Sequence, residues 1–352
     1  MHHKLLFLWI LALLMVACGG RPPAGPPNTT ADTVSNNNVN TTADIPNETS
    51  ANPDAITVTS ARSICQGRND FSQIPAAYVA GLTRYTTLNT HYLVNVCTED
   101  SNGDGRADYM VVESTDQPEH ESIYFPEGHV HHEPFDFNTN IYKFAAVYTN
   151  QRAHSAGNNQ IEEQAIIMKM PITPRAASNK TATTYDTIGL ALNGVAFFNE
   201  NAGPGDEITE ELFTFDQCSG HPQQQGTYHY HVDPVCLIRD LGGDVLTETS
   251  TADGTGYTWL TDAGTNAGLL LGFLMDGFPV YGPLGATAEL DCAGAAVSTP
   301  IDAFNGHEHC TAEFPTGIYH YHVKTANSGG ANNPVFWITN EYYYGEPGTL
   351  GR

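Results

Sequence analysis

The sequence predicts a mainly β protein, built as a single large β-rich domain with few short helices; two pseudo-repeated lobes are the open alternative. Short runs rich in β-branched and aromatic residues recur along the chain, and such runs are typical of strands. The 33 glycines and 21 prolines supply turns between them. The tetrapeptide Tyr-His-Tyr-His also occurs twice, at 228–231 and 319–322, which indicates a repeated strand.

The first residues predict export from the cytoplasm. Lys4 precedes an apolar run, 5–16, that is too short to span a membrane and has the form of a secretory signal. The run closes in Leu14-Met15-Val16-Ala17-Cys18, which is similar to a bacterial lipobox. We therefore expect residues 1–17 to be a lipoprotein signal peptide and Cys18 to carry lipid. An ordinary signal peptide and an uncleaved anchor are the alternatives.

The next segment, 18–56, is rich in Pro, Thr, Asn and Ala and contains no apolar cluster. Such a segment cannot bury enough surface to offset its ordering entropy, so we expect a disordered tether. The predicted globular parts are an N-terminal β segment, 57–115, and a larger domain, 116–352. The predicted location is extracytoplasmic, with the protein held at the outer membrane or cell surface by its lipid.

The charge of the chain excludes some partners. Asp and Glu number 39 against 14 Lys and Arg, which leaves a formal net charge of −25 and no basic run. We therefore expect no binding to nucleic acid or to anionic membrane surfaces. An acidic surface favours cations.

Local patterns predict the individual elements. Segment 74–88 has an Ala-rich middle and is the best candidate for a helix. The predicted strands are 92–96, 108–113, 142–148, 165–170, 189–198, 269–275 and 335–339.

The cysteines predict disulfides. Six cysteines follow Cys18, and an even number in an oxidising compartment indicates paired thiols. Pairing between sequence neighbours is expected, because the last two pairs enclose loops of equal length. The predicted pairs are Cys65–Cys97, Cys218–Cys236 and Cys292–Cys310. Thiolate ligation of a metal is the weaker alternative, because the chain has no Cys-x-x-Cys.

The segment 100–108 resembles the front of an EF-hand calcium loop. Oxygen-bearing side chains stand at alternate positions, and a glycine at position six allows a sharp bend. The candidate Ca²⁺ ligands are Asp100, Asn102, Asp104, Asp108 and the carbonyl of Arg106. Position 12 is Val111 rather than Glu, and the flanks resemble strands, so we expect a lone loop within a β hairpin. A plain Asn/Asp/Gly turn is the alternative.

The histidines of the repeat predict a transition-metal site. On a strand, alternate residues face one side, so each Tyr-His-Tyr-His presents two imidazoles together. Each copy also follows a Gly-His. Imidazoles suit Zn²⁺ or copper, and pseudo-symmetric halves are expected to bring them to one site. The candidate ligands are His221, His229, His231, His307, His320 and His322. Buried, hydrogen-bonded histidines beside core tyrosines are the alternative.

Three further sites are weaker candidates. His120 and Asp276 are included as possible supporting ligands, although Asp276 has the position of a turn cap. The histidines at 129–132 lie among Pro and acidic residues, which favours a solvated loop.

Several strings together resemble the YHYH family of secreted proteins. They are Leu192-Asn193-Gly194-Val195, Asp216 to His221, Gly226 to His231, Asp276 to Gly282 and Gly317 to His322, with Gln117-Pro118-Glu119-His120 as a less distinctive element. The resemblance covers about 116–345 and implies a secreted domain with matched histidine positions; it implies no particular activity. The chain differs from the family in an insertion before His307 that carries Cys292, and in the absence of a cysteine from 335–344.

Three functions remain open, and the sequence does not decide whether the protein is an enzyme. The first is a lipid-anchored metal-binding module. The second is a His-ligated enzyme, either a zinc hydrolase or a copper oxidoreductase. The third is a surface module that recognises a polymer or protein partner. A closed four-ligand site favours the first, an open three-ligand site the second, and dispersed histidines the third.

Overall fold

The computed structural model describes residues 63–88, 93–133, 159–203, 211, 214–216, 218–244, 266–284, 289–327, 334–338 and 341–352. The predicted signal peptide, Cys18, the tether and the strand at 142–148 lie outside these ranges. Residues 51–352 form one compact unit. Within the described ranges, no helix has the length and apolarity needed to cross a membrane.

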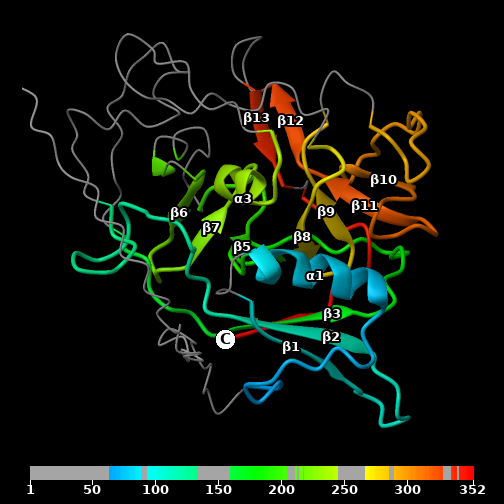
Figure 1. Ribbon diagram of the computed structural model, residues 1–352, viewed down its shortest axis with the longest axis horizontal. Coiled ribbons are helices and arrows are strands. Elements are labelled where there is room, and N and C mark those ends of the chain that lie inside the picture. Colours follow the sequence, from blue (N-terminus) through cyan, green and yellow to red (C-terminus); the bar gives the residue numbers. More distant parts are fainter. Residues whose placement is uncertain are drawn as a thin grey trace, which may run out of the picture. The chain divides into compact units, whose positions relative to one another are not determined.

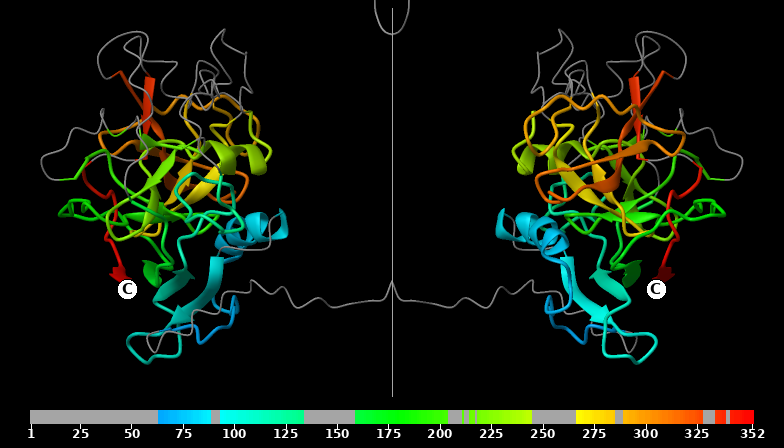
Figure 2. Two further views of the ribbon diagram at one scale, coloured as in Figure 1. Left: turned by 90° about the vertical axis from the view of Figure 1, so that its left-hand side faces the viewer. Right: turned by 90° about the vertical axis from the view of Figure 1, so that its right-hand side faces the viewer.

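A four-stranded antiparallel sheet contains the calcium-type loop. Its order is β1-β2-β3-β14, and its strands are β1 Leu93–Glu99, β2 Tyr109–Ser114, β3 Ile166–Pro171 and β14 Thr349–Gly351. The views in Figure 2 show β1 to β3, in cyan and green, below the yellow and orange strands. This sheet joins the predicted N-terminal segment 57–115 to strands from the rest of the chain.

An eight-stranded sheet contains both Tyr-His-Tyr-His segments (Figure 1). Its order is β10-β11-β9-β8-β4-β5-β7-β6. The strands are β4 Gly189–Ala191, β5 Ala196–Phe197, β6 Gly220–Pro222, β7 Tyr228–Tyr230, β8 Leu270–Leu274, β9 Pro279–Tyr281, β10 Gly306–His309 and β11 Ile318–His322. The paired strands β6 and β7 lie at one end of the sheet, and β10 and β11 lie at the other.

The pairing pattern of this sheet is the same in both directions from its centre. The central strands β4 and β8 are antiparallel. On each side the next pairing is antiparallel, the following one parallel and the last antiparallel. Strands β4 to β7 therefore correspond to β8 to β11, so the two-lobed repeat exists, but both lobes belong to one sheet.

The predicted helix is α1, Ala76–Leu88. Pro75 precedes it, and the carbonyl of Pro75 accepts the amide protons of Tyr78 and Val79. The Tyr78 ring lies 5.3 Å from that of Phe273 on β8. The Tyr78 hydroxyl donates to the carbonyl of Gly277 at 2.9 Å, which fixes the helix against the turn after β8. A short helix, α3 (Val235–Asp240), and a hairpin of β12 (Lys324–Asn327) and β13 (Pro334–Trp337) complete the described elements.

All three predicted disulfides are confirmed: Cys65–Cys97, Cys218–Cys236 and Cys292–Cys310. Cys65 and Cys97 pack with Val111 and Ile167 on the four-stranded sheet. The main core continues from that sheet into the eight-stranded one and includes buried tyrosines of both repeats.

Candidate metal centres

The two histidine repeats form β hairpins with matched registers. In β10 and β11, His307 stands opposite His320. In β6 and β7, His221 stands opposite His229. Each Gly-His therefore lies across from the first histidine of its Tyr-His-Tyr-His, and the period of two places the second histidine on the same face.

The tyrosines occupy the opposite face and are buried. Tyr228 donates to Asp216 and Tyr319 donates to Asp302, at 2.8 and 3.0 Å. Tyr321 donates to Asp276 at 2.5 Å. A tyrosine-to-carboxylate bond thus supports each hairpin from behind.

The histidines form two groups rather than one shared site. The first group is His221, His229 and His231, and we call it cluster 1. The second is His307, His309, His320 and His322 with Glu289, and we call it cluster 2. The expected convergence on one site is wrong, because the two hairpins are at opposite ends of the eight-stranded sheet.

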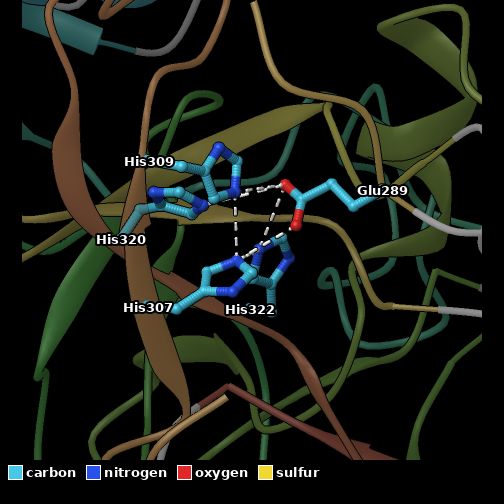
Figure 3. A group of neighbouring side chains, drawn as sticks. All are labelled: Glu289, His307, His309, His320 and His322. Carbon is cyan, nitrogen blue, oxygen red and sulfur yellow. Dashed lines mark hydrogen bonds and ion pairs between the residues drawn. The ribbon is translucent and has the colours of Figure 1, made fainter. Parts of the chain in front are cut away.

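In cluster 2, four imidazoles and one carboxylate point at one another (Figure 3). His307 Nε2 lies 3.0 Å from His322 Nε2 and 3.2 Å from His309 Nε2. A Glu289 oxygen lies 3.0 Å from His307 Nε2 and another lies 3.1 Å from His309 Nε2. The distances to the Nε2 atoms of His322 and His320 are 3.4 and 3.7 Å. Such separations suit neighbouring ligands around one ion with metal–ligand bonds of about 2.0–2.2 Å.

The backbone orients each of these rings. Every Nδ1 atom lies within hydrogen-bond distance of a carbonyl oxygen: Thr299 for His307 (2.7 Å), Cys310 for His309 (2.8 Å), Ile318 for His320 (3.0 Å) and Gly282 for His322 (2.8 Å). A neutral imidazole that donates through Nδ1 carries its lone pair on Nε2. Ring nitrogens of metal-binding histidines have the same arrangement. All four lone pairs of cluster 2 are therefore directed to one point.

Charge in cluster 2 is concentrated on Glu289 and His307. Burial raises the pKa of Glu289, but its hydrogen bonds to His307, His320 and His322 outweigh burial and hold that pKa well below its usual range. Burial lowers the pKa of His307, but Glu289 outweighs it and the net shift is upward. Burial lowers the pKa of His320 to about 4. Without a metal, His307 is therefore the ring of cluster 2 whose protonated form the carboxylate favours.

Cluster 1 holds three buried histidines and has a carboxylate nearby. His229 Nε2 and His231 Nε2 are 3.0 Å apart. A Glu211 oxygen lies 3.7 Å from His221 Nε2 and 3.8 Å from His231 Nε2. Burial lowers the pKa of His229 far below its ordinary value and that of His231 to about 4. Both rings are therefore neutral, as metal ligation requires.

The approach to each hairpin repeats a short unit. Asp216 and Asp302 each stand five residues before the Gly-His histidine, and each accepts the hydroxyl of the first tyrosine. Ser219 and Asn305 each have a positive φ, 74° and 73°. The glycine that follows lies against the tyrosine ring in both copies. The two copies are therefore alike in structure as well as in sequence.

The weaker candidates lie on the tyrosine face. His120 Nε2 is 3.0 Å from the Tyr228 hydroxyl. Its nearby Cys218 and Cys236 are disulfide-bonded and cannot serve as thiolate ligands. Asp276 accepts Tyr321 and the amides of Phe278 and Gly345, so it caps its turn and supports the hairpin.

Two other predicted loops have the expected positions. The segment 100–108 joins β1 to β2 as a hairpin connection. Asp100 accepts the amides of Gly103 and Gly105 at 2.6 and 2.7 Å, and Asp108 accepts Ser101 at 2.9 Å. The histidines at 129–132 lie in turns; the His129 ring is stacked on Phe125 at 4.1 Å.

Sequence reasoning missed Glu211, Glu289 and His309 as site residues. His309 stands two residues after His307, so the same period of two that pairs the other histidines could have identified it. Neither glutamate lies in a motif. Glu211 follows the β4–β5 hairpin, Glu289 follows the β8–β9 hairpin, and each precedes the Asp-x-x-x-Gly-His of its lobe. This equivalent position becomes visible only when the two lobes are aligned through the strand order of the sheet.

Comparison with curated proteins and comparison with solved structures each find no match. A family model does match, over residues 167–299. That segment includes cluster 1 and Glu289, whereas the histidines of cluster 2 follow it. The matching model is described as YHYH protein, and over this segment the chain is similar to the YHYH family.

Proposed function

We propose that the protein is a lipid-anchored, extracytoplasmic metal-binding protein whose transition-metal centre is cluster 2. The observation that carries this proposal is the convergence of four Nε2 atoms on one carboxylate, with all five ligand atoms within 4.8 Å of one another. Every one of the rings is oriented by a backbone oxygen through Nδ1.

The chemistry of the donors supports a borderline divalent cation. Imidazole nitrogens suit zinc, copper, iron and nickel, and copper(II) binds most tightly in the Irving–Williams order. Two neutral imidazoles cannot hydrogen-bond through two Nε2 lone pairs, so a proton or a metal must lie between His307 and His322. A metal satisfies all four lone pairs at once.

The enzyme and the recognition module, the two alternative functions, differ from this proposal in how many ligands the metal has and in how far apart the histidines lie. Histidines that are grouped this closely disfavour a recognition surface of separate side chains. Five donors leave little room for a substrate on the metal in cluster 2, which favours binding or structural support over catalysis there.

The direct test is metal analysis of the mature chain after incubation with Zn²⁺ or Cu²⁺ and removal of free ion. The double change His307→Ala/His322→Ala removes the closest pair of donors. We expect the wild-type chain to retain copper in preference to zinc, and the variant to retain one equivalent less.

His129→Ala/His131→Ala is the matched control, because it removes two histidines outside both clusters. Glu289→Gln, which keeps the side-chain shape, should weaken binding without unfolding the chain, as read by circular dichroism. Equal metal content in the wild type and in both cluster 2 variants would contradict the proposal.

The proposal also includes a calcium site in the loop 100–108. Asp100 already organises the loop through three backbone amides, and Asp104 and Asp108 lie on the same exposed turn. Ca²⁺ should raise the melting temperature of the wild-type chain by mass action. The shift should disappear in Asp104→Ala and persist in Glu127→Ala, an exposed acidic control. A shift that survives Asp104→Ala contradicts this site.

The lipid anchor has its own test. Cys18→Ser in the full-length precursor should move the protein from the membrane fraction to the soluble extracytoplasmic fraction. Membrane retention of this variant after removal of the segment 1–17 would contradict lipidation at Cys18 as the anchor.

A further inference from the structure

Cluster 1 faces a cavity of about 470 Å³. All three of its histidines line this cavity, together with Glu211 and Thr214. The buried rings are therefore not enclosed on every side by core residues. A metal bound by them has space for a further ligand beside it.

The three imidazoles of cluster 1 present their lone pairs together. His229 Nδ1 lies 3.0 Å from the Thr227 carbonyl, and His231 Nδ1 lies 2.6 Å from the Asn199 carbonyl. Both rings therefore donate through Nδ1 and carry the lone pair on Nε2.

His221 reaches the same state through a hydroxyl. Its Nδ1 lies 2.5 Å from Thr214 Oγ1. The single hydroxyl proton of Thr214 is donated to the Glu211 carbonyl at 2.7 Å. Thr214 Oγ1 must therefore accept from His221 Nδ1, and His221 Nε2 has the lone pair.

The ligand count differs from that of cluster 2. Cluster 1 offers three nitrogens, and its nearest described carboxylate oxygen is 3.7–3.8 Å from two of them. Tetrahedral ligands at zinc–nitrogen bond lengths lie about 3.3 Å apart. Unlike Glu289, Glu211 is not part of the group of ligand atoms that all lie within 4.8 Å of one another. It therefore stands to one side of the three nitrogens, at a distance suited to a hydrogen bond with a metal-bound water. Three protein ligands with one exchangeable position are the arrangement of catalytic zinc sites.

The cavity lining indicates which molecules fit. Amides and hydroxyls dominate its polar groups, and the described lining contains no Lys or Arg; Asn159, Asn201, Gln223 and Tyr185 are representative. Glu211 adds negative charge. An anionic substrate therefore has no cationic side chain to pair with here, whereas an uncharged polar molecule finds donors and acceptors.

We infer that His221, His229 and His231 form a second metal centre whose remaining position is open to the cavity and takes water or an uncharged ligand that carries hydroxyl or amide groups. This centre stands on contacts independent of cluster 2, so either can exist without the other.

Cobalt substitution tests this inference, because the visible spectrum of Co²⁺ reports its coordination. The full chain should bind two Co²⁺ ions, one of them lost in His229→Ala/His231→Ala and the other in His307→Ala/His322→Ala. Imidazole serves as the small uncharged probe. It should change the spectrum of the wild type and of the variant that lacks cluster 2, and leave unchanged the variant that lacks cluster 1.

The charge of the cavity has a separate readout. Azide, an anionic probe, should bind about tenfold more tightly to cobalt-loaded Glu211→Gln than to the wild type, because a nearby negative charge is removed. Imidazole affinity should change less than that.

The possible failures are distinct. One Co²⁺ per wild-type chain, still present in His229→Ala/His231→Ala, overturns the second centre and leaves the function proposed for cluster 2 intact. Two bound ions with no imidazole response overturn the open position. Equal azide affinity in the wild type and Glu211→Gln overturns the ligand class. If the double variant loses its circular dichroism spectrum, the single change His231→Gln replaces it, with the same expected loss of one ion.

Discussion

At the scale of residues, the hydrogen-bond partner of each Nδ1 atom sets the orientation and tautomer of the histidine rings in both clusters. Nδ1 contacts to carbonyl oxygens in cluster 2, and to two carbonyls and a hydroxyl in cluster 1, settle the tautomers before any metal arrives. Metal ligation then requires no reorientation of the rings. The clusters differ in the position of the nearby carboxylate. Glu289 lies among the Nε2 atoms of cluster 2, whereas Glu211 lies farther from those of cluster 1.

Proton release on metal binding should distinguish the clusters. Because the pKa of His307 is raised above 6.5, this ring is more than half protonated at pH 6.5 in metal-free cluster 2, and a metal must displace its proton. The lowered pKa values of His229 and His231 leave those rings neutral well below pH 6.5. At pH 6.5 we therefore expect cluster 2 to release more protons per metal than cluster 1.

Isothermal titration calorimetry in buffers of different ionisation enthalpy measures this difference. His229→Ala/His231→Ala isolates cluster 2, and His307→Ala/His322→Ala isolates cluster 1. Equal proton release in the two variants would contradict the assigned pKa shifts.

Tyr321→Phe should lower stability without loss of metal. The Tyr321 hydroxyl donates to buried Asp276 and accepts the amide of Tyr344 at 2.7 Å. Its removal leaves buried polar groups unpaired, at a cost of about 1–3 kcal/mol in the free energy of unfolding. The histidines face the other side of β11, so metal content should persist. Urea unfolding measures the loss; Tyr342→Phe, an exposed tyrosine, is the control.

At the scale of elements, each cluster is built on a two-stranded hairpin that has a histidine face and a tyrosine face with different roles. The histidine face collects the nitrogens, and the tyrosine face anchors the hairpin to buried carboxylates in the core. In each hairpin, the glycine of Gly-His packs closely against the ring of the first tyrosine of the repeat. This contact determines how near the two strands of the hairpin lie to each other.

Gly306→Ala should therefore damage cluster 2 through its strand. A Cβ at Gly306 would overlap the carbonyl oxygen of His320 and the ring of Tyr319. We expect a destabilisation of about 1–3 kcal/mol and weaker metal binding as β10 shifts away from β11. Gly268→Ala, where an added Cβ meets no atom within 4 Å, is the control. Unchanged metal affinity in Gly306→Ala would show that the glycine contact does not position His307.

At the scale of the whole molecule, a repeated strand arrangement within a single sheet carries two unlike histidine clusters. The strand pairings of the lobes correspond one to one, yet one lobe carries three histidines facing a cavity and the other four histidines around a carboxylate. The disulfides brace this arrangement at different places. Cys292–Cys310 ends beside His309, whereas Cys65–Cys97 ties the start of the described chain to β1.

Cys65→Ser/Cys97→Ser should reduce global stability while both clusters keep their metal. Opening a loop with a sequence separation of 32 is expected to cost about 4 kcal/mol through the entropy of the unfolded chain. Thermal unfolding and metal analysis check the two halves of this expectation. Loss of metal from the folded variant would mean that the four-stranded sheet controls the clusters.

Local patterns were sufficient for most elements. The helix at 74–88, the strands at 108–113, 165–170 and 269–275, and the disulfide pairs follow from apolar runs, turns and spacing. Six of the seven clustered histidines were also identified, four from the period of a strand and two from the Gly-His that precedes each repeat. The position of Glu289 was not, because a lone glutamate in an irregular segment has no periodicity to distinguish it from a solvated one.

The sequence by itself determined that the chain is β-rich, disulfide-bonded and, over residues 167–299, similar to the YHYH family, and that each repeat aligns two histidines on one strand face. These properties depend on local periodicity and residue type. Only the tertiary structure decided that the repeats stay apart, that a glutamate joins cluster 2 and another lies near cluster 1, and that cluster 1 faces a cavity. Those properties depend on strand order and on contacts between distant segments, which no local pattern encodes.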